Sequence, residues 1–214
     1  DLRPFFQGPI LDQGKVSSCT ANAAAHTLRF SPVSEKNRSP IEISRLFLYY
    51  HARLTLGQTP PLSDNGCTSM ATCETLADLG ACPETMWPYD PTSVNIEPPS
   101  HCEGAAEHYI TARLQYIPVP LDLDHIKSCL SSGHVIQAGM EVFGSFLTPQ
   151  VAQTGMVPLP GANEQVQGGH AVVICGYTSD HFIMLNSWGE SWGDKGYFHL
   201  PFEYLSYMFD FWTL

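Results

Sequence analysis

Residues 13–28 read QGKVSSCTANAAAHTL, and this stretch sets one cysteine at a defined point of the fold. From Cys19 to Leu28 the residues are small and favour a helix, and the hydroxyls of Ser17 and Ser18 can cap its first amides. A thiol in the first turn of a helix faces the positive end of the helix dipole, which lowers the thiol pKa. An isolated cysteine is more often a small buried apolar residue, so Cys19 needs an imidazole partner before it counts as a nucleophile.

The strongest candidate for that partner is His170, because Gly168 and Gly169 precede it and a buried strand pattern follows it. This context predicts an imidazole at the mouth of a cleft, whereas the other eight histidines are interpreted as residues whose hydrogen bonds are satisfied in turns. Asn186 follows sixteen residues later, at the end of the strand predicted over 182–185. Two adjacent strands would bring the Asn186 amide oxygen against the imidazole and fix its tautomer.

The pattern changes from helices to strands about halfway along the chain. A helix is predicted from Ser39 to Leu54, with Ser39 as N-cap and Pro40 in the first turn, and a second from Ser69 to Leu79. The later elements are a helix over 124–130 and strands over 135–142, 171–174, 182–185 and 196–200. Helices followed by strands predict an α+β fold with a cleft between two lobes. We therefore expect residues 1–214 to form one domain, with a helical lobe over about 1–110 and an antiparallel β-rich lobe over about 111–214.

Composition excludes several classes of protein. With 43% apolar residues among 214, the chain can bury a core. Ten Lys and Arg against 21 Asp and Glu give a net charge of −11, which repels phosphate backbones, so nucleic acid is not an expected partner. The longest apolar run, 171–175, is too short to span a membrane. Only 14% of the residues are charged, which suits a secreted or otherwise extracytoplasmic protein.

The seven cysteines show no spacing of the kind that builds a structural zinc site. If one of them is chemically special, six remain that could pair. Disulfide bonds are therefore expected, and six reduced, buried thiols are the alternative.

Four motifs in order then resemble the papain family of cysteine peptidases. They are residues 13–19 (QGKVSSC), 169–172 (GHAV), 186–189 (NSWG) and the pair 192–193 with 196–197. The resemblance implies a papain-like two-lobed fold with Cys19 as the nucleophile, His170 as general base and acid, and Asn186 orienting His170. It further implies that Gln13 donates to the oxyanion together with the Cys19 amide, and that Trp188 covers the Asn–His hydrogen bond. The alternative interpretation of Gln13 is a solvated loop glutamine, and that of Trp188 is a core tryptophan.

Substrate contacts also follow from the resemblance, and Trp188 is counted among them. Gly66 lies where the family pairs with the peptide backbone, and Cys67 replaces the second glycine of the usual pair, so that Cys67 is either a substrate contact or a disulfide partner. Gly168 and Gly169 lie where the family lines its main specificity pocket, which implies room for a bulky or apolar side chain. Turns with positive φ would explain all of these glycines equally well.

Two positions depart from the family pattern. Val16 replaces a cysteine that is often in a disulfide, and Thr20 replaces the aromatic residue that usually follows the nucleophile. These departures indicate an altered disulfide framework and a divergent branch of the family, of a kind expected in microbes. The chain is compact, with little room for an occluding insertion, which favours an endopeptidase.

Two alternatives to a peptidase remain open. The same acyl-thiolate could transfer its acyl group to an amine, and a papain-like fold without catalysis could simply bind proteins or peptides. A metal hydrolase is disfavoured, because His170 has no carboxylate or second histidine at ligand spacing, and no metal or cofactor is expected. The expected partners are protein or peptide substrates and a pro-segment or proteinaceous inhibitor, and the expected state is a monomer.

Overall fold

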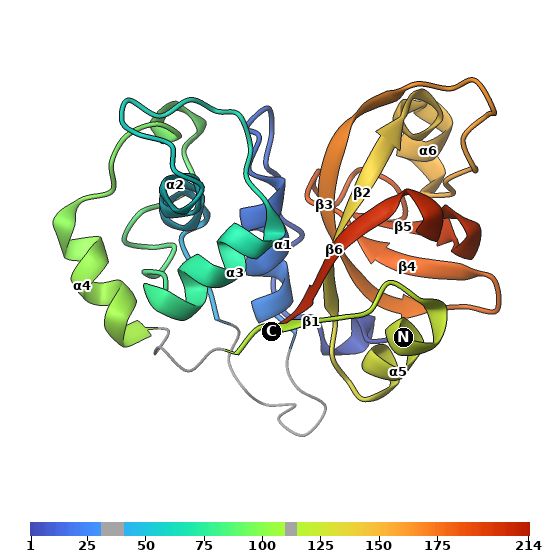
Figure 1. Ribbon diagram of the computed structural model, residues 1–214, viewed down its shortest axis with the longest axis horizontal. Helices are drawn as coiled ribbons and strands as arrows, with labels where there is room; N and C mark the ends of the chain where they lie inside the picture. The colour runs from blue at the N-terminus through green and yellow to red at the C-terminus, as the bar shows by residue number, and fades with distance from the viewer. Residues whose placement is uncertain (31–40, 110–114) are drawn as a thin grey trace.

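The computed structural model describes residues 1–30, 41–109 and 115–214. Its helices are α1 (Cys19–Leu28), α2 (Arg45–Thr55), α3 (Ser69–Asp78), α4 (Ser100–Tyr109), α5 (Leu123–Ser131) and α6 (Pro149–Thr154). Its strands are β1 (Ile117–Pro118), β2 (Ile136–Phe143), β3 (Val166–Tyr177), β4 (His181–Leu185), β5 (Tyr197–Pro201) and β6 (Met208–Thr213). The helices α1 to α4 fill one half of the molecule, and the sheet fills the other half with α5 and α6 beside it (Figure 1). The α+β class is confirmed.

The strands form one antiparallel sheet in the order β1-β6-β2-β3-β4-β5. β3 is longer than the predicted strand over 171–174, and it includes Gly168 and Gly169. The interpretation of these two glycines as turn residues is therefore wrong, because they pair with Val142 and Glu141 of β2. The first four residues of β3 are exposed, and the strand becomes buried at His170.

α1 begins at Cys19 as predicted, and it lies along the sheet side of the helical half (Figure 1). Its alanines are buried, and small side chains let the helix approach β3 closely. The predicted capping by Ser18 is wrong, because the Ser18 side chain makes no capping hydrogen bond to this helix. The Ser18 hydroxyl instead lies 2.7 Å from the hydroxyl of Tyr89.

α2 begins later than predicted. Ser39 and Pro40 lie outside the described residues, and the helix starts after Ser44, whose Oγ accepts from the backbone N–H of Phe47. The segment before it is held in a different way, since Ser44 N donates to the backbone oxygen of Cys82 at 2.8 Å and Ile43 forms a β-bridge with Pro83. These contacts keep the chain extended until residue 44.

The remaining predictions of elements are confirmed with small shifts of their ends, and α4, α6, β1 and β6 were not predicted. The apolar core is divided between the two halves: one cluster includes Ile136, Met184 and Phe198, and the other includes Phe47 and Leu76. The lobe boundary near residue 110 stays a prediction, since 110–114 lie outside the described residues. Among the helices of the described part, none has the length and apolar character to cross a membrane.

Candidate active site

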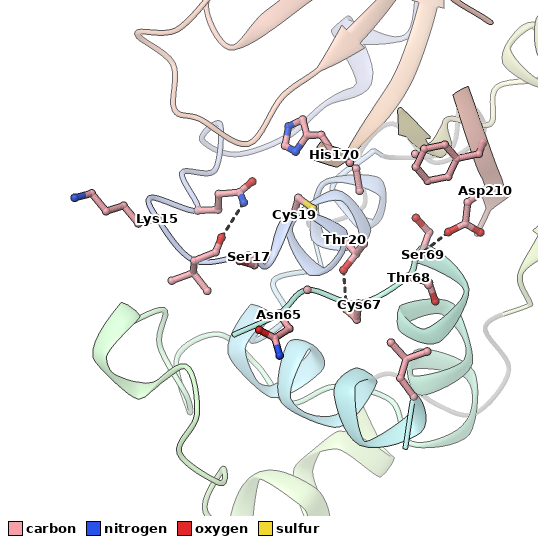
Figure 2. A pocket seen from close by; sticks show the side chains of 18 of the residues that line it. Lys15, Ser17, Cys19, Thr20, Asn65, Cys67, Thr68, Ser69, His170 and Asp210 are labelled. Atoms are coloured by element: carbon pink, nitrogen blue, oxygen red, sulfur yellow. Dashed lines mark hydrogen bonds between the residues drawn. The ribbon is translucent and has the colours of Figure 1, made fainter. Parts of the chain in front are cut away.

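A cleft of about 790 Å³ brings together residues from both ends of the sequence. Gln13, Cys19 and Cys67 line it from the helical half, and His170 and Asp210 line it from the sheet. Figure 2 shows His170 across the cleft from Cys19, whose sulfur lies at the N-terminal end of α1. The cysteine and the histidine that the sequence singled out thus share one site, although 151 positions (170 − 19) separate them in the chain.

Burial dominates the protonation of Cys19. It raises the pKa of the thiol, while hydrogen bonds from the backbones of Ala171 and Thr20 act in the opposite direction. The helix N-terminus alone therefore does not make this thiol a thiolate at neutral pH. A base must accept its proton.

His170 is held in one tautomer by Asn186. His170 Nε2 lies 2.8 Å from Asn186 Oδ1, and the same oxygen accepts from the backbone N–H of Ser187 at 2.9 Å. An amide oxygen can only accept, so Nε2 carries the proton of the neutral ring and Nδ1 carries the lone pair. Burial lowers the pKa of His170 to about 4, and the bond to Asn186 acts in the opposite direction. His170 is therefore a neutral proton acceptor at pH 7.

Trp188 stacks on the His170 ring, with centroids 4.9 Å apart and an angle of 27° between the planes. It also lines the cleft and meets Trp192 and Phe146 edge-on. The indole therefore packs between the imidazole and an aromatic group of the sheet half. Such a cover keeps water from the ring and fixes its orientation.

The side chain of Gln13 is buried and held at both ends of its amide. Nε2 donates to the backbone oxygen of Val16 at 2.9 Å, and Oε1 accepts from Ser187 Oγ at 2.6 Å. The backbone N–H of Gln13 also donates to the Ser187 oxygen at 2.9 Å. Since an amide nitrogen carries two hydrogens and Val16 takes one, the second can bind an oxygen atom of a bound molecule.

The predicted substrate-binding residues are divided by the structure. Gly66, Cys67, Gly169 and Trp188 line the cleft, whereas Gly168 does not belong to its lining among the described residues. Gly66 has φ of 81°, in the region that favours glycine, and its N–H donates to the Tyr49 hydroxyl at 2.9 Å. Only its carbonyl is therefore left for a ligand.

The expected disulfides are not seen: all seven cysteines of the described chain are free thiols in this structure. Cys67 Sγ lies 2.9 Å from Thr20 Oγ1, and burial raises the pKa of Cys67 to about 12. Hydrogen bonds join the loops here: Asp64 accepts from the backbone N–H of Ser17 at 3.0 Å and from the Tyr49 hydroxyl at 2.7 Å. A carboxylate thus ties the segment that contains Val16 to the loop before Cys67.

Several residues of the cleft were missed by sequence reasoning, among them Gly139, Phe209 and Asp210. Asp210 has φ of 58°, and its carboxylate accepts from Ser69 N at 2.9 Å and from the Trp212 indole at 2.5 Å. The one available signal was Gly139, because a glycine inside a buried strand marks a close approach. A Cβ there would lie 2.4 Å from the Phe209 ring.

Comparisons with known proteins concern the family and the fold of the chain. The family described as papain family cysteine protease matches residues 5–204. An uncharacterized peptidase C1-like protein of Acanthamoeba polyphaga mimivirus is 36% identical over 95% of this chain and 68% of its own length. A cathepsin B-like protein of Giardia intestinalis is 24% identical over 89% of this chain and 63% of its own length.

Solved structures extend the likeness to three dimensions. Xylellain, a cysteine protease from Xylella fastidiosa, superposes with a TM-score of 0.85 and 34% identity, covering 96% of this chain and 82% of its own. The Carica candamarcensis cysteine protease CMS1MS2, solved in complex with E-64, gives a TM-score of 0.67 at 19% identity, covering 91% of this chain and 83% of its own. At that identity the second likeness concerns the fold alone.

Proposed function

This chain belongs to the papain family of cysteine proteases, and we propose that it hydrolyses peptide bonds through an acyl-enzyme on Cys19, with His170 as base and acid. The observation that carries the proposal is the 2.8 Å hydrogen bond between His170 Nε2 and Asn186 Oδ1. It leaves the lone pair of Nδ1 to accept a proton inside the cleft that Cys19 lines.

The first step is transfer of the thiol proton from Cys19 to Nδ1 of His170. Burial disfavours charge on either group alone, since it raises the pKa of the thiol and lowers that of the imidazole. Thiolate and imidazolium therefore form together, as a pair of opposite charges in a partly enclosed site. Asn186 stabilises the imidazolium by accepting from Nε2.

The thiolate then attacks the carbonyl carbon of the peptide bond. A C–S bond forms, the π electrons of the C=O bond move to oxygen, and this oxyanion accepts from Gln13 Nε2 and from the Cys19 backbone N–H. The C–N bond breaks as His170 returns its proton to the leaving amine, which leaves a thioester on Cys19. Water gives a proton to His170 and attacks the thioester, and the C–S bond breaks as the acid leaves. His170 then returns the proton to the Cys19 sulfur, which restores the thiol.

The peptide would lie along the cleft, beside Gly66, Cys67 and Gly169, with the Gly66 carbonyl as its backbone acceptor. Internal cleavage, which makes the protein an endopeptidase, is part of the proposal and is decided by the lengths of the products. Secretion, a monomeric state and a pro-segment or proteinaceous inhibitor stay predictions.

Turnover of fluorogenic peptides, and of internally quenched peptides that report cleavage within the chain, is measured in the wild type and in Cys19→Ala. Cys67→Ala is the matched control. Cys67 is the other thiol that lines the cleft, so its alanine variant can change KM but should keep kcat, while Cys19→Ala should lose turnover. Labelling with E-64, followed by peptide mass spectrometry, should modify Cys19 alone. Turnover by Cys19→Ala, or a label on Cys67 in its place, contradicts the proposal.

The nature of the acceptor needs a separate measurement, because hydrolysis and acyl transfer share the thioester. Product analysis with and without an added amine separates them: hydrolysis gives the free acid in both cases. A mainly amide product would make the protein an acyl transferase. Absence of both products, with substrate still bound, would make it a binding module.

A further inference from the structure

A chain of hydrogen bonds runs behind the cleft, from Arg45 on α2 to the loop that carries Gln13. Arg45 Nη1 donates to Asn22 Oδ1 at 3.0 Å, and Asn22 Nδ2 donates to Ser18 Oγ at 3.0 Å. Ser18 Oγ lies 2.7 Å from the Tyr89 hydroxyl, which donates to the backbone oxygen of Gln13 at 2.9 Å. Ser18 and Asn22 are fully buried, so water does not compete for the bond between them, and the other bonds of the chain are part-buried.

The two ends of the chain fix the direction of every bond in it. A guanidinium can only donate and a backbone carbonyl can only accept. Because Tyr89 uses its one proton on the Gln13 oxygen, it accepts from the Ser18 hydroxyl, which in turn accepts from Asn22. All the donors therefore point from Arg45 towards Gln13. Hydrogen bonds aligned in this way strengthen one another.

Ser18 and Tyr89 connect the two segments that carry the proposed oxyanion donors. Ser18 immediately precedes Cys19, whose backbone N–H is one donor, and Gln13 supplies the other through Nε2. We propose that Tyr89 is a positioning residue that sets the spacing of these two donors, through its two hydroxyl bonds. This inference rests on the proposed function, because it gives Gln13 and the Cys19 amide their role.

The rest of Tyr89 is held independently of its hydroxyl. The Arg45 guanidinium lies 3.9 Å from the centre of the Tyr89 ring, and it forms an ion pair with Glu84 at 2.9 Å. The Tyr89 backbone N–H also donates to Glu84 at 3.0 Å. Tyr89→Phe thus removes both links to the site and keeps the ring and the backbone in place.

The test compares turnover of a peptide substrate with alkylation by iodoacetamide. Tyr89→Phe is expected to lower kcat about tenfold with little change in KM, since a displacement of about 1 Å can cost up to about a hundredfold in rate. Alkylation builds no oxyanion, so its rate and its pH profile should stay those of the wild type. Ser18→Ala breaks the next bond of the same chain and should act in the same direction, which provides a second variant if Tyr89→Phe folds poorly.

A double-mutant cycle with Gln13→Ala isolates the coupling. On the Gln13→Ala background, Tyr89→Phe should cost less than about threefold, because one of the two donors that it positions is already absent. The matched control is Tyr204→Phe, which removes another buried hydroxyl, one that donates to the backbone oxygen of Glu141 at 2.8 Å in the sheet half. That variant should keep kcat.

The outcomes separate the two proposals. Loss of alkylation together with kcat, or additive effects of Tyr89→Phe and Gln13→Ala, would mean that Tyr89 only supports the fold and would overturn the inference. A wild type that is active but unaffected by Tyr89→Phe also overturns it. A wild type without peptidase activity, or one in which Gln13→Ala costs nothing, overturns the proposed oxyanion hole and the inference with it.

Discussion

The two sides of the cleft hold their reactive groups by different means. On the sheet side, His170 is paired with Met140 in the register of β2 and β3, and the strand fixes its position through backbone bonds. On the helical side, Gln13 lies on a loop, and side chains of Ser187 and Tyr89 supply much of its support. Backbone hydrogen bonds between strands do not depend on any one side chain. A chain of side-chain hydrogen bonds, in contrast, is interrupted when one of its residues is replaced.

The largest expected effect comes from removing the imidazole itself. His170→Ala should lower kcat/KM by about 10⁴-fold, because general acid and base catalysis are both lost. Alkylation of Cys19 should also move to alkaline pH, since burial raises the pKa of a thiol that has no base beside it. Stopped-flow alkylation between neutral and alkaline pH measures this shift. An unchanged profile would show that Cys19 is activated by its helix alone.

Asn186→Ala sharpens the comparison on the sheet side. We expect a loss in kcat of about a hundredfold, because the ring keeps its strand position but loses the acceptor that fixes its tautomer. Asn186→Asp keeps an acceptor at that place and should recover part of the activity. Full activity in Asn186→Ala would mean that the strand register and the stack on Trp188 suffice to align His170.

Acid should weaken the helical side through His26, which is buried in α1. Leu11 N donates to His26 Nε2 at 2.9 Å, so the ring must be neutral there, and burial lowers its pKa well below the ordinary value. The folded state thus binds fewer protons than the unfolded one, and stability is lost as the pH falls below about 6.5, the ordinary pKa of histidine. The lowered pKa of His170 likewise reduces the stability of the folded state as the pH falls.

Protonation of His26 leaves the Leu11 donor without its acceptor, which costs about 1–3 kcal/mol. Urea unfolding at pH 7 and pH 5 measures the loss. His26→Gln keeps an acceptor without a titration, so this variant should lose the part of the pH dependence that belongs to His26. Equal pH dependence in the variant and the wild type would contradict the assignment.

The smallest expected effect is on the sheet, at Gly139. A Cβ there would meet the Phe209 ring at 2.4 Å, but the ring is 45% exposed and can swing outwards. Gly139→Ala should therefore cost about 1 kcal/mol and raise KM, because Phe209 lines the cleft. Gly168→Ala is the matched control, since nothing lies within 4 Å of a Cβ added there. Equal stability and KM in the two variants would show that the Phe209 contact affects neither the free energy of unfolding nor substrate binding.

The sequence predicted what depends on local patterns. Small residues after Cys19 predicted α1, and the buried run after His170, with Asn186 beyond the next strand, predicted the neighbours that orient the imidazole. β6 could not be predicted in the same way, because the exposed Phe209 and the positive φ of Asp210 interrupt its alternation. α4 carries few apolar residues and many exposed ones, so its helical period is weak.

Contacts between distant residues were beyond any local pattern. Ser18 is of a residue type that is favoured at the N-cap of a helix, yet its hydroxyl is hydrogen-bonded to that of Tyr89, 71 positions away. The start of α2 was misplaced because residues 43 and 44 pair with 82 and 83, which no pattern near Ser39 reveals.

Ser187 joins the two sides of the cleft, since its hydroxyl and its backbone oxygen both bind Gln13, and its N–H binds the side chain of Asn186. An inhibitor that pushes the Gln13 loop aside therefore pulls on the segment that orients the imidazole. A substitution at Gln13 that weakens inhibitor binding would therefore also lower activity, because it removes a contact to the segment that orients His170.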